Sequence, residues 1–494
     1  GSAFALTGPS AILAFVINGF VALLTALSFA EMATAFPESG GTYVFARRVL
    51  SVRSAFVVGW VLWFAYIAAG LLYALGFGAF AAAALRALLP TDSGLLVLLS
   101  PTVLALGSVA VYTALFMRKA GGGGVWETVG KVVVFAVLIA AGLGMLPFRA
   151  ATGDIGAVTP LFVGGAGGFA AAMGLTFIAL QGFDAIAAVA GEVRDPARVL
   201  PRAMAGSIGI ALLIYVPLLV VVATVGVPAG EGVASLAASD PETLIARAAE
   251  RMLGPVGWWL VIVAALLSML SALAANVVAA SRVAASMAAD RTLPSVLGVL
   301  DPSSGAPRLA VFASGLAMAV LLGIVSDVPS AGAAASLIFL LSFLLAHVTA
   351  LLARLRGGGG RSDAFRAPLF PLVPVLGILS CALLAGYQLG TQPQGTGVTA
   401  AWIGLGALLY AALFQERAAT MDARAEAADP ELARLRGRSP LVLAPLANPE
   451  HAGSLVALAR AIAPPGVGRV LLLSILKADA DAPGALAAEV ERAQ

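Results

Sequence analysis

Long apolar stretches, separated by short polar or Gly- and Pro-containing segments, fill this chain up to about Arg417. A helix needs about 20 mostly apolar residues to cross the hydrocarbon core of a bilayer. Each of the eleven stretches approaches or exceeds that length, so the pattern predicts eleven membrane-spanning helices. They cover residues 10–36, 54–85, 97–117, 126–147, 166–190, 203–226, 254–285, 308–326, 333–354, 371–391 and 398–415.

The loops between these predicted helices alternate in charge. Cytoplasmic loops of membrane proteins carry an excess of Lys and Arg, so the richer side is predicted to be cytoplasmic. That side has 15 such residues: Arg47, Arg48, Arg53, Arg118, Lys119, Arg194, Arg198, Arg202, Arg282, Arg291, Arg308, Arg354, Arg356, Arg361 and Arg366. The other side has four: Arg86, Arg149, Arg247 and Arg251.

The composition excludes a soluble globular protein. The 494 residues are 60% hydrophobic and 11% charged, whereas soluble domains carry about 25% charged residues. A net charge of +3 gives no sign of nucleic-acid binding. The single cysteine excludes an intramolecular disulfide, and two distant histidines cannot by themselves form a metal site. We therefore predict no cofactor and no metal. Since no acid–base or nucleophile–base arrangement emerges from the spacing, we also predict no enzyme.

The composition changes after the last apolar stretch. Residues 417–438 are rich in Arg, Glu and Ala and are predicted to form a helical cytoplasmic linker. The segments that follow alternate between strand and helix patterns: Leu441–Leu446, 450–463, Val470–Leu476 and 482–493. This order predicts the start of an α/β domain over 439–494, with too little chain to close its sheet. Residues 1–416 form the predicted membrane domain.

Lys131 and Asp184 give the strongest signals among the charged residues inside the apolar stretches. Lys131 is the only lysine there, and a lysine at the bilayer centre costs about 2.5–3.5 kcal/mol unless it finds water or a partner. Its ammonium group either extends to the cytoplasmic surface or points into the bundle, where it could replace a sodium ion or respond to protonation. Asp184 follows Gly182 in mid-helix, which predicts a helix break whose freed backbone groups hold a substrate or ion. Alternatively, Asp184 only caps the second half-helix.

Other polar residues give weaker signals. Glu31, near the cytoplasmic end of the first stretch, is either a coupling carboxylate or, as we favour, a partner for a basic loop. Ser268, Ser271 and Asn276 either line a polar cavity or allow close helix packing. His347 is expected to be a hydrogen-bonded core residue rather than a proton relay.

Four segments carry a resemblance to a known family. They are Ala30–Val44; Gly182–Asp184 with Glu192–Pro196 and Leu200–Pro201; Ser281–Arg282 with Met287 and Asp290–Pro294; and Phe365–Pro368 with Pro371 and Pro374. In this order and spacing they resemble the amino acid–polyamine–organocation permease family. The resemblance implies an all-α, LeuT-like membrane fold with two five-helix inverted repeats plus two further helices.

The same resemblance assigns the site. It places residues 166–190 on the sixth helix, which is unwound at the substrate site in this family. The residues expected to contact substrate are Phe177, Ile178, Ala179, Leu180, Gln181 and Gly182. Lys131 falls on the fifth helix, where a lysine takes the place of sodium in sodium-independent members. This favours proton-coupled or exchange transport over sodium symport.

The resemblance also concerns the two ends of the sequence. Thr7–Ser10 matches the family's loop between its first and second helices, so we expect the first helix to be missing from this sequence. A second alignment makes Gly1–Phe4 a degenerate remnant of the first-helix motif. The tail resembles the beginning of a universal stress protein domain, a nucleotide-binding module. Its phosphate loop is missing here, so nucleotide binding is not predicted for this fragment.

The sequence therefore predicts a secondary transporter of amino acids or related amines in a prokaryotic inner membrane, with a cytoplasmic tail. Its partners would be a small-molecule substrate, the lipid bilayer and, for a coupled mechanism, protons. One alternative is an inorganic cation–chloride cotransporter of the same fold, since Gly191–Pro196 has a faint likeness to that group. Another is a membrane sensor of amino acids that signals through the C-terminal domain.

Overall fold

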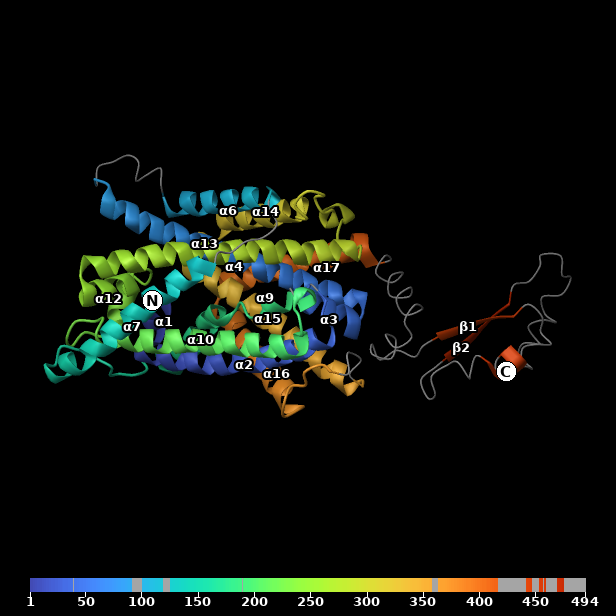
Figure 1. The fold of residues 1–494 in the computed structure, drawn as a ribbon, viewed down its shortest axis with the longest axis horizontal. Helices are drawn as coiled ribbons and strands as arrows, with labels where there is room; N and C mark the ends of the chain where they lie inside the picture. Colours follow the sequence, from blue (N-terminus) through green and yellow to red (C-terminus); the bar gives the residue numbers. More distant parts are fainter. Residues whose placement is uncertain are drawn as a thin grey trace.

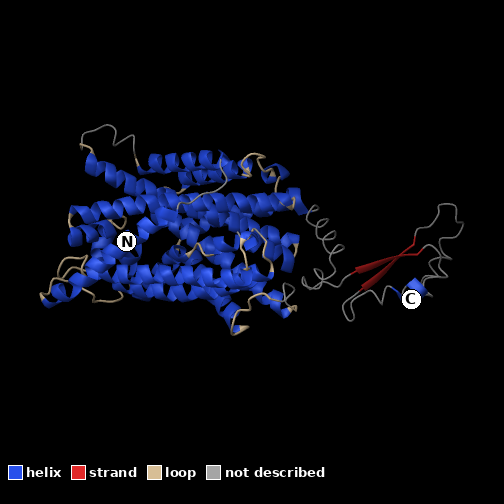
Figure 2. Ribbon diagram, in the orientation of Figure 1, coloured by secondary structure: helices blue, strands red, loops and turns tan. Residues whose placement is uncertain are grey.

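The computed structural model describes residues 1–415, except 39, 91–99, 119–124, 189 and 358–362. In the C-terminal part it describes only residues 441–446, 453–455, 457–458 and 469–474. Long helices run roughly parallel along the bundle (Figure 1), and nearly all of its described secondary structure is helical (Figure 2).

Ten helical segments in this described part are long and apolar enough to cross a membrane, and α14, with 17 residues, is slightly shorter. The longer helices are α2 (Ala11–Ala35), α4 (Val52–Leu88), α6 (Pro101–Arg118), α7 (Val125–Ala151), α8 (Gly165–Thr176), α10 (Pro196–Thr224), α13 (Pro255–Ala289), α14 (Arg308–Ile324), α15 (Val328–Leu355), α16 (Leu372–Thr391) and α17 (Pro393–Leu409). The shorter elements are α1 (Ser2–Thr7), η1 (Gly8–Ser10), α3 (Thr42–Val49), η2 (Phe177–Leu180), α9 (Asp184–Ala188), η3 (Ala190–Glu192), α11 (Val233–Ser239), α12 (Leu244–Leu253), η4 (Ser295–Gly298) and η5 (Tyr410–Phe414). Each of the eleven predicted spans thus corresponds to an apolar helical segment.

Helix α4 lies at the centre of the bundle. It packs against α13, α15 and α6, while α2 packs against α10. Small residues allow these close approaches, as is usual between helices in lipid. At Gly76 of α4, for example, an added Cβ would lie 2.9 Å from the Sδ atom of Met269 on α13.

One end of the bundle collects the Arg-rich loops, and we call it the basic end. Arg47 of α3 pairs with Asp290 just after α13, at 2.8 Å. Arg356, after α15, donates to the carbonyl oxygen of Val49 at 3.1 Å. Arg308 donates to the carbonyl oxygen of Met117 at 3.0 Å. These contacts tie four of the loops predicted for one side to one another or to neighbouring helix ends.

The opposite end carries α11 and α12, two helices that the apolar pattern did not predict. Helix α12 buries Leu244, Ala248 and Met252 and packs against α13. Arg251 at its end pairs with Asp154, and Arg149 donates to the carbonyl oxygen of Arg251 at 3.1 Å. This end is therefore held by its few arginines.

Two strands form in the tail, close to the predicted positions. Strands β1 (Leu441–Leu446) and β2 (Arg469–Ser474) pair in parallel, with Leu441 opposite Arg469. The predicted linker 417–438 and the last predicted helix, 482–493, lie outside the described residues. The assignment to an α/β domain stays a prediction.

Candidate functional site

The predicted break interrupts a membrane-spanning helix in the middle of the bundle. Helix α8 ends at Thr176, a 3-10 turn (η2) follows, and α9 begins only at Asp184. Between them Gln181 is extended, and Gly182 has a φ of +127°. Residues with side chains rarely adopt that φ, whereas glycine does so at little cost. The glycine therefore permits the chain to leave and re-enter the helical conformation within three residues, and the predicted break is confirmed.

Asp184, the first residue after the break, holds the break in place through its side chain. The carboxylate is buried, with 1% of the residue exposed. Its Oδ1 accepts hydrogen bonds from the Gly182 N–H at 3.0 Å and from Gln181 Nε2 at 3.4 Å. Its Oδ2 accepts from the Tyr66 hydroxyl of α4 at 2.6 Å. The side chain thus folds back onto the residues that precede it, in addition to starting α9.

Polar side chains from three other helices bind the carbonyl groups at the end of α8. Asn18 Nδ2 of α2 donates to the carbonyl oxygen of Met173 at 2.7 Å. Gln388 Nε2 of α16 donates to that of Gly174 at 3.0 Å, and the Ser336 hydroxyl of α15 donates to the same oxygen. Because lipid offers no water to satisfy such groups, these contacts stabilise the broken helix.

A cavity of about 390 Å³ lies directly beside the break. None of the described residues that line it has a charged side chain, and its polar side chains are Ser2, Thr176 and Tyr215. Tyr215 of α10 also fixes the break, because its hydroxyl donates to the carbonyl oxygen of Ala179 at 3.2 Å. The lining comprises Gly1, Ser2, Ala3, Phe4, Phe15, Leu72, Phe135, Leu175, Thr176, Ile178, Ala179, Tyr215, Leu218, Leu219, Ile245, Met269, Val328, Pro329 and Gly332.

The six residues predicted to contact substrate divide into groups. Ile178 and Ala179 line the cavity. Phe177 and Leu180 are buried, and the Phe177 ring packs against Phe343 of α15 with its centroid 5.7 Å away. Gln181 contacts Asp184, as described above, and Gly182 is exposed. The structure therefore brings two of the six side chains to this cavity.

Lys131 lies on α7, one helical turn before Phe135, which lines the cavity. Residues four apart share a helix face, so Lys131 lies on the same face of α7 as this lining residue. The lysine is half-buried, and no hydrogen bond or ion pair joins it to another described residue. Whether its ammonium enters the bundle stays a prediction.

The polar residues of α13 lie apart from the cavity lining. Ser268 and Ser271 are half-buried, and neither is among the residues that line the cavity, whereas Met269 between them is. Asn276 is buried and donates to the carbonyl oxygen of Ala272, within its own helix, at 2.8 Å. These contacts fit the packing interpretation better than a polar cavity.

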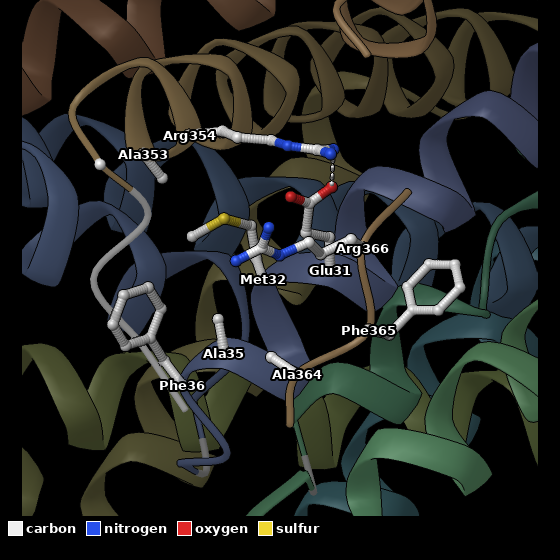
Figure 3. A pocket seen from close by; sticks show the side chains of 10 residues that line it. Glu31, Met32, Ala35, Phe36, Ala353, Arg354, Ala364, Phe365 and Arg366 are labelled. Carbon is white, nitrogen blue, oxygen red and sulfur yellow. Dashed lines mark hydrogen bonds and ion pairs between the residues drawn. The ribbon is translucent and has the colours of Figure 1, made fainter. Parts of the chain in front are cut away.

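Glu31 joins α2 to the loop that precedes α16. Its Oε2 accepts from the Ala367 N–H at 3.0 Å and pairs with an Arg354 guanidinium nitrogen at 3.4 Å. Figure 3 shows the carboxylate directed at Arg354, and both residues line a pocket of about 230 Å³. Arg354 also lies over the Phe370 ring, 4.4 Å from its centroid. This geometry is that of a partner for a basic loop.

Asp290, just after α13, binds two residues of α3 at the basic end, and we call this connection between α13 and α3 the latch. Asp290 binds Arg47 at 2.8 and 2.9 Å and accepts from the Tyr43 hydroxyl at 2.7 Å. Burial and the Asp290 charge raise the pKa of Tyr43 above its usual range, so the hydroxyl stays a donor. Nearby, the Gly40 N–H donates to the carbonyl oxygen of Ala188 at 3.1 Å, which connects this region to α9.

His347 is fully buried between two hydroxyl groups of α2. The Thr25 hydroxyl donates to the carbonyl oxygen of Val21 at 2.9 Å, so its oxygen accepts from His347 Nε2 at 3.1 Å. His347 Nδ1 then accepts from the Ser28 hydroxyl at 2.9 Å. Both ring nitrogens are bonded in the neutral form, as expected for a core histidine.

Sequence reasoning missed several side chains that shape the break. Tyr66, Tyr215, Asn18 and Gln388 each interrupt an otherwise apolar helix, and that isolation was an available signal. Polar side chains in such positions commonly hydrogen-bond across helices. Their partners, however, depend on helices that are far apart in the sequence.

A helical membrane bundle with a discontinuous central helix, freed backbone groups and an adjoining cavity defines a membrane transporter rather than an enzyme. The model of the amino acid permease family matches residues 1–417, so the chain belongs to that family. It is similar to the serine/threonine exchanger SteT of Bacillus subtilis, with 26% identity over 81% of this chain and 88% of SteT.

Two further relatives agree. An uncharacterized transporter of Mycobacterium tuberculosis is 30% identical over 82% of this chain and 83% of its own length. The branched-chain amino acid permease BcaP of Bacillus subtilis is 26% identical over 78% of this chain and 82% of BcaP. The protein is thus an integral membrane transporter of the amino acid permease family.

Proposed function

We propose that this protein is a secondary transporter of amino acids or related amines that works by alternating access across a prokaryotic inner membrane. The observation that carries the proposal is the helix break at Gln181–Phe183 beside a cavity of about 390 Å³. Discontinuous helices of this kind form the substrate sites of many secondary transporters. Family membership and the names of SteT and BcaP support the substrate class.

The substrate would lie against Thr176, Ile178, Ala179 and Tyr215, which line the cavity at the break. Backbone groups at the break would bind its amino and carboxyl groups. The rest of the lining is apolar, and an unpaired charge buried there would be costly. The lining therefore favours neutral substrates with apolar side chains over those with charged side chains.

Helix packing supports the proposed pair of inverted repeats. In the resemblance, α2, α4 and α6 are the second, third and fourth helices, and α10, α13 and α14 are the seventh, eighth and ninth. The pairs α2–α10, α4–α13 and α6–α14 each pack together. Two repeats related by a pseudo-twofold axis would bring equivalent helices together in this way.

The coupling mode follows from the resemblance at Lys131, which favours proton coupling or exchange. The charge bias of the loops supports a cytoplasmic location for the basic end and for the tail. In the described part of the tail, the two parallel strands support a universal stress protein-like domain and, through it, a sensor function. A cation–chloride cotransporter gains no support from the cavity lining or from the relatives' names.

Counterflow in proteoliposomes tests this function. Vesicles loaded with an unlabelled neutral amino acid should accumulate the labelled one, without any ion gradient. Ala179→Leu would fill the cavity at the break and should raise KM or abolish counterflow. Ala166→Leu, at an exposed position of α8, is the matched control and should not. No counterflow with any amino acid, or chloride-dependent flux instead, would refute the proposal.

A further inference from the structure

Asp184 is a buried acid without a cation. Only 1% of the residue is exposed, and no Lys, Arg or His side chain pairs with it among the described residues. An ionised carboxylate in an apolar interior is costly, so such a group tends to take up a proton. The organisation of the break alone does not require an ionisable group, because an amide oxygen could accept the same bond from Gly182.

The hydrogen bonds around Asp184 favour its ionised form, whereas burial favours its protonated form. Tyr66, Gln181 and the Gly182 N–H all donate to its two oxygens. Donors favour the ionised form of a carboxylate, and bonds to charged groups are the stronger ones. The shortest, 2.6 Å, comes from Tyr66. The protonation of Asp184 therefore depends on whether the Tyr66 hydroxyl is in place.

This bond joins two elements that alternating access would move relative to each other. Asp184 begins α9, the half-helix after the break, whereas Tyr66 belongs to the central helix α4. The two donors from the break itself, Gln181 and Gly182, would move with Asp184. Of the three donors, Tyr66 is thus the one whose distance from Asp184 Oδ2 would change during alternating access.

Among the described residues, no basic side chain forms an ion pair with the Asp184 carboxylate. Of the side chains that the structure describes, Tyr66 of α4 is the titratable one that hydrogen-bonds to the carboxylate, whereas Tyr73, two turns further along α4, makes no hydrogen bond to it. Of the described ionisable side chains on the helices packed against α9, none bonds to it. They are Glu31 on α2, which pairs with Arg354; Arg198, Arg202 and Tyr215 on α10; and Arg282 on α13.

We propose that the Asp184–Tyr66 pair is the proton-binding site of the transport cycle. Asp184 Oδ2 takes up a proton when the Tyr66 hydroxyl moves away, and releases it when that hydrogen bond forms again. Protonation is thereby linked to the movement of α9 against α4. The inference rests on the proposed transport function and assigns the proton to Asp184 instead of Lys131.

The test compares two assays in the same proteoliposomes. Counterflow without a pH gradient measures transport itself, and uptake driven by an inward proton gradient measures coupling. For Asp184→Asn, we expect gradient-driven accumulation, normalised to the remaining counterflow, to fall to the level without a gradient. Accumulation at the wild-type ratio would overturn the proposal. If the wild-type protein itself catalyses counterflow but shows no gradient-driven accumulation, the proposal would also be overturned, and the proposed transport function would stand.

Tyr66→Phe keeps the experiment decisive if Asp184→Asn does not fold. Without the hydroxyl donor, the ionised form of Asp184 is less stabilised, so a larger fraction of Asp184 is protonated at a given pH. The pH at which uptake is half-maximal should therefore rise by about one to two units. Tyr73→Phe, on the same helix but without a hydrogen bond to Asp184, is the matched control. Equal pH midpoints in both variants and the wild type would overturn the proposal.

Discussion

Replacement of Gly182 by alanine tests whether the break depends on the backbone freedom of glycine. Its φ of +127° is a conformation that L side chains rarely adopt, and no atom lies within 4 Å of an added Cβ. The cost of Gly182→Ala would therefore be backbone strain without a steric clash, of order 1–3 kcal/mol. Such an energy would lower the population of the broken conformation by about 5- to 150-fold.

Thermal unfolding in detergent and counterflow in proteoliposomes measure this effect. We expect Gly182→Ala to lower Tm and to reduce the counterflow rate. Gly209→Ala on α10 is the matched control, because its Cβ also meets open space but its backbone is helical. Alanine is favoured over glycine in a helix by about 0.5–1 kcal/mol, so the control should be neutral or slightly stabilised. Wild-type stability and transport in Gly182→Ala would refute the reasoning.

Two further predictions concern packing and the latch. An added Cβ at Gly377 would lie 2.1 Å from His347 Cε1, so Gly377→Ala should cost about 1–3 kcal/mol and lower Tm in a thermal melt. Gly386→Ala, in open space on the same helix, should not, and equal melting of the two variants would contradict this account. Asp290→Ala removes one of the two carboxylates that pair with Arg47 and leaves Glu38, so it should speed tryptic cleavage after Arg47, whereas unchanged cleavage would argue against a latch.

The sequence predicted the membrane spans because hydrocarbon imposes a minimum length on every apolar helix. It also predicted the break, because Gly182 and Asp184 interrupt one apolar stretch only two residues apart. Helix α12 was missed because it is amphipathic: Arg247 and Glu250 face outward while Leu244 is buried against its neighbours. Such a pattern does not resemble a membrane span.

The details of the site could not be predicted in the same way. Ile178 and Ala179 reach the cavity whereas Leu180 does not, and this division depends on how the 3-10 turn η2 is rotated in the bundle. The bond from Tyr66 to Asp184 joins residues 118 positions apart. Such contacts are set by helix packing and not by any local pattern.

Substrate protection of a single cysteine at the break tests the central claim most directly. In a Cys381→Ser background, Ala179→Cys would be labelled with a thiol reagent, with and without a saturating transported amino acid. If the substrate lies at the break, it should slow this labelling while labelling of the exposed Ala166→Cys control stays unchanged. Equal labelling of Ala179→Cys with and without substrate would contradict the claim that the amino acid binds there.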